Sequence, residues 1–123
     1  MKIKNLGFCI NFVVMVIVFS KCLVPKRFVG ITIFPFVILR NKNLKNDNVL
    51  LYHERIHLKQ QLEMLVVFFF VWYGIEFLIR FIRHKNRFIA YRNISFEREA
   101  YANERDFKYL ENRTWLAFLK YLK

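Results

Sequence analysis

Two of the chain's three histidines lie four residues apart, and a glutamate directly follows the first of them. His53, Glu54 and His57 form the pattern H-E-x-x-H within the stretch LLYHERIHLKQQLE. On a helix, residues four apart lie on the same face, so both imidazoles could reach one metal ion. Zinc accepts neutral imidazole nitrogen at about 2.0–2.1 Å. The spacing therefore predicts a helix with a two-histidine metal site on one face.

Glu54 is placed to act as a base rather than as a ligand. It follows the first histidine and precedes the second by three residues, which puts it on the metal side of the helix but too far round to coordinate easily. Zinc lowers the pKa of a coordinated water from 15.7 towards about 7, and a nearby carboxylate can take the proton as that water attacks a carbonyl. The alternative is a surface histidine pair on a charged helix, which Arg55 and Lys59 favour.

A zinc site built on two histidines needs a third protein ligand. The acidic helix start NISFEREAYANE supplies three carboxylates, at Glu97, Glu99 and Glu104. H-E-x-x-H followed by a helix with E-x-E-A resembles the gluzincin metallopeptidases. The closest likeness is to the membrane-bound prenyl-protein protease and heat-shock peptidase group, and to small gluzincin-like domains. The resemblance covers roughly Ile31 to Asn103, and it implies Zn²⁺, a peptide or protein substrate, and Glu97 as the third ligand.

The chain departs from this family pattern at Tyr101. There the family carries an aspartate that orients a ligand histidine. The departure favours a second hypothesis, a catalytically degenerate zincin-fold membrane protein that acts as a binding module. If the protein is an enzyme, Tyr101, Tyr91 and His84 are the candidates for stabilising the oxyanion. The resemblance also implies that the strand before the motif helix, within GITIFPFVIL, binds extended substrate backbone.

Composition and charge narrow the class of protein. The chain has 123 residues, enough for one domain, with 56% hydrophobic and 19% aromatic residues and a formal net charge of +12. Basic residues interleaved with bulky apolar ones point to an anionic membrane surface, and no nucleic-acid reader motif is present. Cys9 and Cys22 form no C-x-x-C pair, which argues against thiolate metal binding. Nothing in the sequence indicates an oligomeric state.

The N-terminal stretch LGFCINFVVMVIVF, residues 6–19, is apolar apart from Asn11. It is short for a membrane span, which needs about 20 residues. A signal-peptide core, a short uncleaved anchor and a buried strand or helix all remain open, although VFSKC offers no small-x-small cleavage site. We expect the anchor helix. Residues 1–24 then attach the protein to the plasma or inner membrane, and residues 25–123 form a small zincin-like domain.

The expected fold class is α+β and mainly α, with an active-site helix, a ligand helix and a short β edge. Residues 28–39 are rich in β-branched and aromatic residues and predict one strand or two short ones. Pro35 cannot donate to a ladder, which favours an edge position or a bulge. Asp47 or Asn48 would cap the motif helix, and a final helical region would begin near Ser95.

The apolar stretch Met64–Ile82 has the length to span a bilayer, but a zinc site with Glu97 conflicts with that. A continuous helix from His57 to Arg83 would be about 39 Å long, while the 14 residues that follow cover only about 21 Å as a helix. We therefore expect the stretch to break near residues 73–74 and fold back. The basic stretch of residues 80–92 would then face anionic headgroups, or else form an ordinary solvated face.

Overall fold

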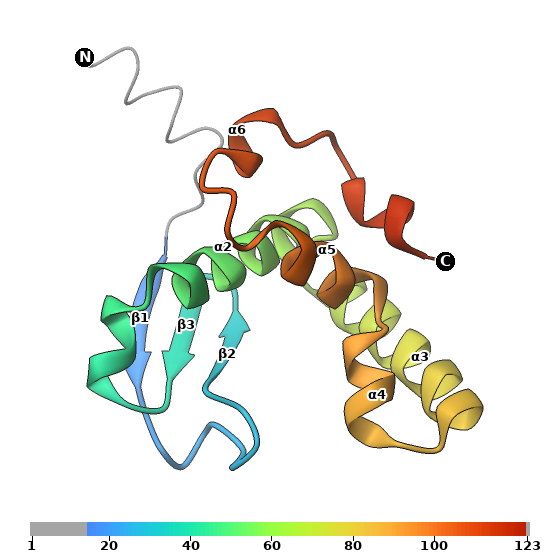
Figure 1. Cartoon of the computed structure of the whole chain (residues 1–123), viewed down its shortest axis with the longest axis horizontal. Helices are drawn as coiled ribbons and strands as arrows, with labels where there is room; N and C mark the ends of the chain where they lie inside the picture. Colours follow the sequence, from blue (N-terminus) through green and yellow to red (C-terminus); the bar gives the residue numbers. More distant parts are fainter. Residues whose placement is uncertain (1–14, 123) are drawn as a thin grey trace.

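A small sheet and a set of helices make up residues 15–122, which are the residues that the computed structural model describes (Figure 1). Strands β1 (Val16–Phe19), β2 (Gly30–Ile33) and β3 (Phe36–Leu39) lie in the order β1-β3-β2, with β1 parallel and β2 antiparallel to β3. The helical elements are the 3₁₀-helix η1 (Lys42–Asn46), α2 (Asn48–Glu63), α3 (Val67–His84), α4 (Arg87–Arg92), α5 (Ser95–Asn103), α6 (Tyr109–Asn112) and the 3₁₀-helix η2 (Ala117–Tyr121). The α+β, mainly helical fold class is thus confirmed.

The expected N-terminal anchor helix finds no support in the structure. Residues 16–19, the end of the apolar stretch, form strand β1, in register with β3 from Val16 opposite Phe36 to Phe19 opposite Leu39. Their sequence, VIVF, is β-branched and aromatic, which suits a strand. Residues 6–14 of that prediction lie outside the described residues. Within residues 15–122, no single helix has the length and apolarity to cross a bilayer, and α2 with α3 meets that test only as a pair bent by 111°.

Residues 28–39 contain two short strands, one of the two alternatives that the sequence predicts. β2 is the outer strand of the sheet and β3 is the central one. Pro35 avoids the ladder by lying in the turn between them, after a cis peptide bond. Val37 and Leu39 of β3 are fully buried and pack against Leu58 of α2, so the sheet supports the motif helix from one side.

Helix α2 lies between the sheet and α5. The Asp47 carboxylate accepts a hydrogen bond from the Leu50 backbone N–H at 3.0 Å, which confirms the predicted cap. On the side of α2 away from Leu58, Ile56 packs with Ala100 of α5. Helix α2 thus packs against the sheet on one side and against α5 on the other, and these contacts set the direction of its polar side chains.

The chain bends between α2 and α3 rather than within α3, so the break expected near residues 73–74 is wrong. Leu65 and Val66 adopt positive φ angles of 57° and 58° at the bend. Helix α3 then runs unbroken through Gly74, which an α-helix tolerates at a cost of about 1 kcal/mol relative to alanine. The reversal comes at Lys85, with φ of 56°, and Asn86, whose side chain caps α4. The α3–α4 hairpin brings the chain back towards α2, as a site with Glu97 requires.

Candidate metal centre

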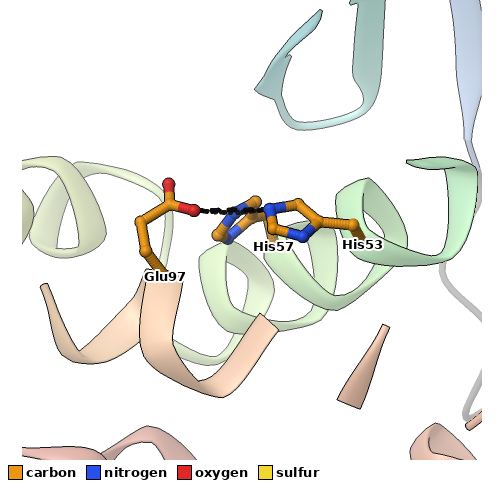
Figure 2. A group of neighbouring side chains, drawn as sticks. All are labelled: His53, His57 and Glu97. Atoms are coloured by element: carbon orange, nitrogen blue, oxygen red, sulfur yellow. Dashed lines mark hydrogen bonds and ion pairs between the residues drawn. The ribbon is translucent and has the colours of Figure 1, made fainter. Parts of the chain in front are cut away.

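Three side chains from two helices converge on one point (Figure 2). The Nε2 atoms of His57 and His53 lie 3.1 and 3.3 Å from Glu97 Oε1, and the two Nε2 atoms are 3.2 Å apart. Each residue is 5% exposed. Together they form a group that could hold a metal ion. The structure thus brings together all three residues that the sequence nominates as ligands.

The spacing of the three ligand atoms fits a tetrahedral ion. Ligand atoms about 2.0–2.1 Å from a tetrahedral zinc stand about 3.3 Å from one another. The observed separations of 3.1–3.3 Å match this value with no movement of the helices. The fourth position of such an ion would face the adjoining cavity, because all three ligands line it.

Each imidazole is oriented by a hydrogen bond at its other nitrogen. His53 Nδ1 lies 2.8 Å from Glu104 Oε1, and His57 Nδ1 lies 2.8 Å from Gln60 Oε1. A carboxylate only accepts, so His53 Nδ1 carries a hydrogen. The Gln60 amide faces His57 with its oxygen because its nitrogen donates to the Phe96 carbonyl at 3.1 Å. Nδ1–H therefore points outward in both rings, which leaves the two Nε2 lone pairs for a shared cation.

In the metal-free protein, protons hold this cluster together. Burial alone would lower the pKa of His57, but the Glu97 carboxylate outweighs it and raises that pKa to about 9. Burial likewise works to raise the pKa of Glu97, and the two histidines more than reverse this and hold it far below its usual range. A proton therefore bridges the group at neutral pH. A divalent cation can displace that proton, since metal ligands bind in their deprotonated forms.

Tyr73 supports the third ligand, and sequence reasoning missed it. Its hydroxyl donates to Glu97 Oε2 at 2.7 Å, which leaves Oε1 for the imidazoles. Burial and the neighbouring carboxylate raise the pKa of Tyr73, so the hydroxyl stays a donor. The only sequence signal was one hydroxyl in a run of phenylalanines, at the position where we expected a break.

Glu54 lies beside the ligands and faces the same cavity. It is 6% exposed, and its Oε1 accepts a hydrogen bond from the Thr32 hydroxyl of β2. Gly30 of the same strand packs closely against β3, because a Cβ there would stand 3.0 Å from Leu39 Cδ2 and 3.3 Å from the Ile38 carbonyl oxygen. Its distance to Glu54 Oε2, 3.8 Å from such a Cβ, is an ordinary contact. The general-base candidate is thus held by the edge strand rather than by the ligands.

The cavity beside the cluster has a volume of about 530 Å³. Its polar end holds the three candidate ligands and Glu54. Its walls are mainly aromatic, and they consist of Phe28, Phe69, Phe70, Tyr73, Phe77, Phe88 and Tyr91. Three cations, Lys26, Arg27 and Arg87, also line it. A cavity of this size is large enough for part of a peptide.

The three oxyanion candidates lie in different places. The Tyr91 side chain lines the cavity, and its hydroxyl lies 2.9 Å from that of Tyr101. Tyr101 packs its ring edge-on against His53, with centroids 4.5 Å apart. His84 is exposed at the end of α3 and does not line the cavity. The carboxylate that contacts His53 Nδ1 is thus Glu104, one turn beyond position 101, where the resemblance implies it.

Glu99, the second carboxylate of E-x-E, belongs to a buried ion-pair network instead of the metal group. Arg113 forms ion pairs with Glu99 and, at 2.7 Å, with Glu63, and all three side chains are at most 1% exposed. Glu99 also accepts from Gln60 Nε2 at 2.9 Å. The network therefore ends on the amide that orients His57. No local sequence pattern marks Arg113 as a member of this network.

Helix α5 is held in position from its first residue. The buried Glu76 carboxylate of α3 accepts from the Ser95 N–H at 2.7 Å and from the Ser95 hydroxyl at 2.6 Å. A carboxylate at a helix N-terminus also interacts favourably with the helix dipole. Phe96 packs its ring between those of Phe69 and Phe118, with centroids 4.4 and 4.3 Å away. These contacts fix the direction in which Glu97 points.

Comparisons with known proteins found no similar family, protein or structure. No protein-family model matches the chain, and neither the curated proteins nor the solved structures contain a match. The side chains of the cluster and the cavity beside it are therefore what bears on function.

Proposed function

We propose that this protein is a membrane-associated zinc metallopeptidase that hydrolyses peptide bonds. The observation that carries the proposal is the convergence of His53 Nε2, His57 Nε2 and Glu97 Oε1 beside a buried Glu54. Three protein ligands and one position open to a cavity are typical of catalytic zinc, whereas structural sites are closed by four.

The donor set favours zinc among the biological cations. Two imidazoles suit zinc, copper, iron or nickel and disfavour magnesium and calcium, which prefer oxygen ligands. The separations of 3.1–3.3 Å between the ligand atoms lie close to tetrahedral spacing, which supports zinc within that group. When bound, zinc acts as a Lewis acid that lowers the pKa of water and polarises a carbonyl.

The protein's own residues would handle the proton and the developing charge. We assign Glu54 as the general base: it takes a proton from the attacking water and returns it to the leaving amine. Its hydrogen bond from Thr32 occupies one carboxylate oxygen and leaves the other for this transfer. Burial and Glu97 raise the pKa of Tyr91, so its hydroxyl stays a donor within the cavity and is our candidate for stabilising the oxyanion.

The outer edge of β2 offers backbone groups to an extended peptide. The Arg40 N–H donates to the Val29 carbonyl at 2.9 Å. Hydrogen-bonded and non-hydrogen-bonded pairs alternate in an antiparallel ladder, so Gly30 and Thr32 direct their backbone groups away from β3. The Thr32 carbonyl is taken by Gln61 Nε2 at 2.7 Å. Both backbone groups of Gly30 and the Thr32 N–H remain for a substrate strand.

A Glu54→Gln variant tests the assignment as an enzyme. The substitution keeps the shape of the side chain and removes its ability to take a proton. We expect it to keep its zinc and to lose hydrolysis of a quenched fluorescent peptide library by at least about 100-fold. Glu111→Gln, an exposed change on α6, is the matched control and should leave the rate unchanged.

The same experiment separates the enzyme from a degenerate binding module. If the wild-type protein holds zinc but cleaves no peptide in the library, the enzymatic proposal is wrong and the binding-module alternative is favoured. If Glu54→Gln cleaves as fast as the wild type, the assignment of the base is wrong.

A further inference from the structure

Helix α3 exposes its apolar residues instead of burying them. Eight apolar side chains along it are 41–67% exposed: Val67, Phe68, Phe70, Val71, Ile75, Leu78, Ile79 and Ile82. At 100° per residue they occupy one continuous half of the helix surface. Within that half the sequence places no charged residue. We call this set of eight residues the outer face of α3.

Apart from Arg83 and His84 at its C-terminal end, the polar residues of α3 point the other way, into the protein. Glu76 is 7% exposed and binds the start of α5. Tyr73 donates to Glu97, and Arg80 donates to the Leu122 carbonyl at 2.5 Å. A surface helix of a globular protein normally shows the opposite arrangement, with its polar side towards water. The medium that contacts the outer face is therefore expected to be apolar.

The outer face is large for a surface that stays in water. Its eight side chains expose on the order of 800 Å², whereas the largest apolar patch on a typical monomer is about 300–600 Å². The face is about 22 Å long from residue 67 to residue 82. On the neighbouring α4, Phe88 and Ile89 are also exposed, by 53% and 43%. The whole α3–α4 hairpin, which projects away from the sheet in Figure 1, thus presents apolar side chains.

Positive charge gathers at the tip of the same hairpin. Arg83, Lys85 and Arg87 are exposed there, and none has an ion pair within residues 15–122. Lys26 and Arg27, at the cavity, add to this charge. An apolar helix face with basic residues beside it is the composition of segments that lie in the interface of anionic membranes. A second copy of this chain would bring the same positive charge to the contact, which disfavours it as the occupant.

We propose that the outer face of α3, with α4, is a docking surface for an anionic phospholipid bilayer. The apolar side chains enter the boundary between headgroups and acyl chains, and the basic tip contacts the lipid phosphates. Phe70 and Phe88 are exposed on this side and also line the cavity. The docked protein therefore opens its cavity towards the membrane. On the peptidase function proposed above, its substrates are then polypeptide segments that lie at the membrane surface.

Vesicle binding of the full chain tests the role of the charges. The probe is phosphatidylcholine vesicles with about one third phosphatidylglycerol, compared with phosphatidylcholine alone. Replacing Arg83, Lys85 and Arg87 by glutamine should weaken partitioning into the anionic vesicles about 100-fold, since each cation near such a surface contributes roughly a factor of five. The matched control replaces Lys42, Lys45 and Lys108, three exposed lysines elsewhere, and should change partitioning less than about tenfold. Equal effects of the two triple variants contradict the proposal.

A depth measurement tests the apolar side of the surface. On a background with Cys9→Ser and Cys22→Ser, a nitroxide on Ile79→Cys should become inaccessible to a polar relaxation agent when vesicles are added. A nitroxide on Lys45→Cys should stay accessible. If the label at position 79 stays in water while the protein is bound, another segment, such as residues 1–14, anchors it and the proposal is wrong. If that label is buried before vesicles are added and light scattering shows a dimer, a second copy covers the face and the proposal is also wrong.

Docking does not depend on the metal or on catalysis. Residue His57 lies on α2, away from the outer face, so the His57→Ala variant should bind vesicles as the wild type does. Loss of zinc or of hydrolysis with intact vesicle binding counts against the proposed enzyme alone. Intact zinc binding without vesicle binding counts against the docking surface alone.

Discussion

Glu104 provides a sharp test of how the metal group is built, because the structure and the family resemblance assign its role to different residues. In the structure, Glu104 Oε1 lies 2.8 Å from His53 Nδ1, while Tyr101 contacts His53 only through its ring. In the resembling peptidases the orienting carboxylate is expected at position 101. Substituting each residue separately shows which one supports the ligand.

Glu104→Ala should weaken zinc binding about 10–100-fold, which is the usual loss when the partner of a ligand histidine is removed. This range corresponds to about 1.4–2.7 kcal/mol at 25 °C. The Glu104 side chain is 20% exposed, so its removal leaves no sealed cavity that would complicate the comparison. Glu104→Gln keeps an acceptor oxygen and should lose less than Glu104→Ala.

The assay is competition for zinc between the protein and a chromophoric chelator at fixed pH. Tyr101→Phe keeps the ring against His53 and should stay within about twofold of the wild type, because the hydrogen bonds that it loses are to Tyr91 and Arg92 and not to His53. An unchanged affinity in Glu104→Ala, together with a tenfold loss in Tyr101→Phe, refutes the reasoning. It would mean that position 101 orients the ligand, as in the family.

Three further predictions concern protons and buried charge. The pKa of His57 rises from 6.5 to about 9 in the folded, metal-free protein. The interaction of protonated His57 with Glu97 therefore stabilises the fold fully below pH 6.5, and this stabilisation is lost as pH rises through 9. Zinc binding at pH 7.5 should therefore release about one proton from His57, which calorimetry in two buffers of different ionisation enthalpy measures. The apparent affinity for zinc should rise about tenfold per pH unit up to about pH 9. Zinc binding without proton release contradicts this prediction. Tyr73→Phe removes the donor to the third ligand and should weaken zinc binding about 3–10-fold in the chelator assay, and an unchanged affinity contradicts that role. Arg113→Met leaves Glu99 buried without its ion-pair partner and should lower the free energy of unfolding by about 3–5 kcal/mol in urea titration. The control Arg105→Met, an exposed change, should lower it by less than about 0.5 kcal/mol. Similar losses in both variants would show that the network does not support the fold.

The parts of the site that the sequence revealed are those with a local signal. His53, Glu54 and His57 lie within one and a half turns of a helix that Asp47 caps, so their shared face follows from helical geometry alone. The short edge strand before them also has a local pattern. Glu97 is different, since only the resemblance singled it out from the acidic residues nearby.

The parts that the sequence missed depend on contacts between distant segments. Tyr73 lies 24 residues from Glu97, and Glu104 lies 51 residues from His53. No spacing rule connects such pairs. The bend at Leu65 and Val66 was also missed, because neither residue is a usual turn former and Gly74 offered a more conventional break. The sequence also leaves strand and helix open over residues 16–19, where the structure has strand β1, because a short apolar run fits either element until its pairing partner is known.

We propose that two imidazoles of α2 and one carboxylate of α5 hold a single zinc ion. Equilibrium dialysis followed by metal analysis tests it most directly, on the wild type, Glu97→Ala and His84→Ala, the last of which changes the exposed histidine outside the cluster. We expect about one zinc per chain in the wild type and in His84→Ala, and almost none in Glu97→Ala under the same free-metal concentration. A wild type without zinc, or a Glu97→Ala variant that keeps a full equivalent, contradicts it.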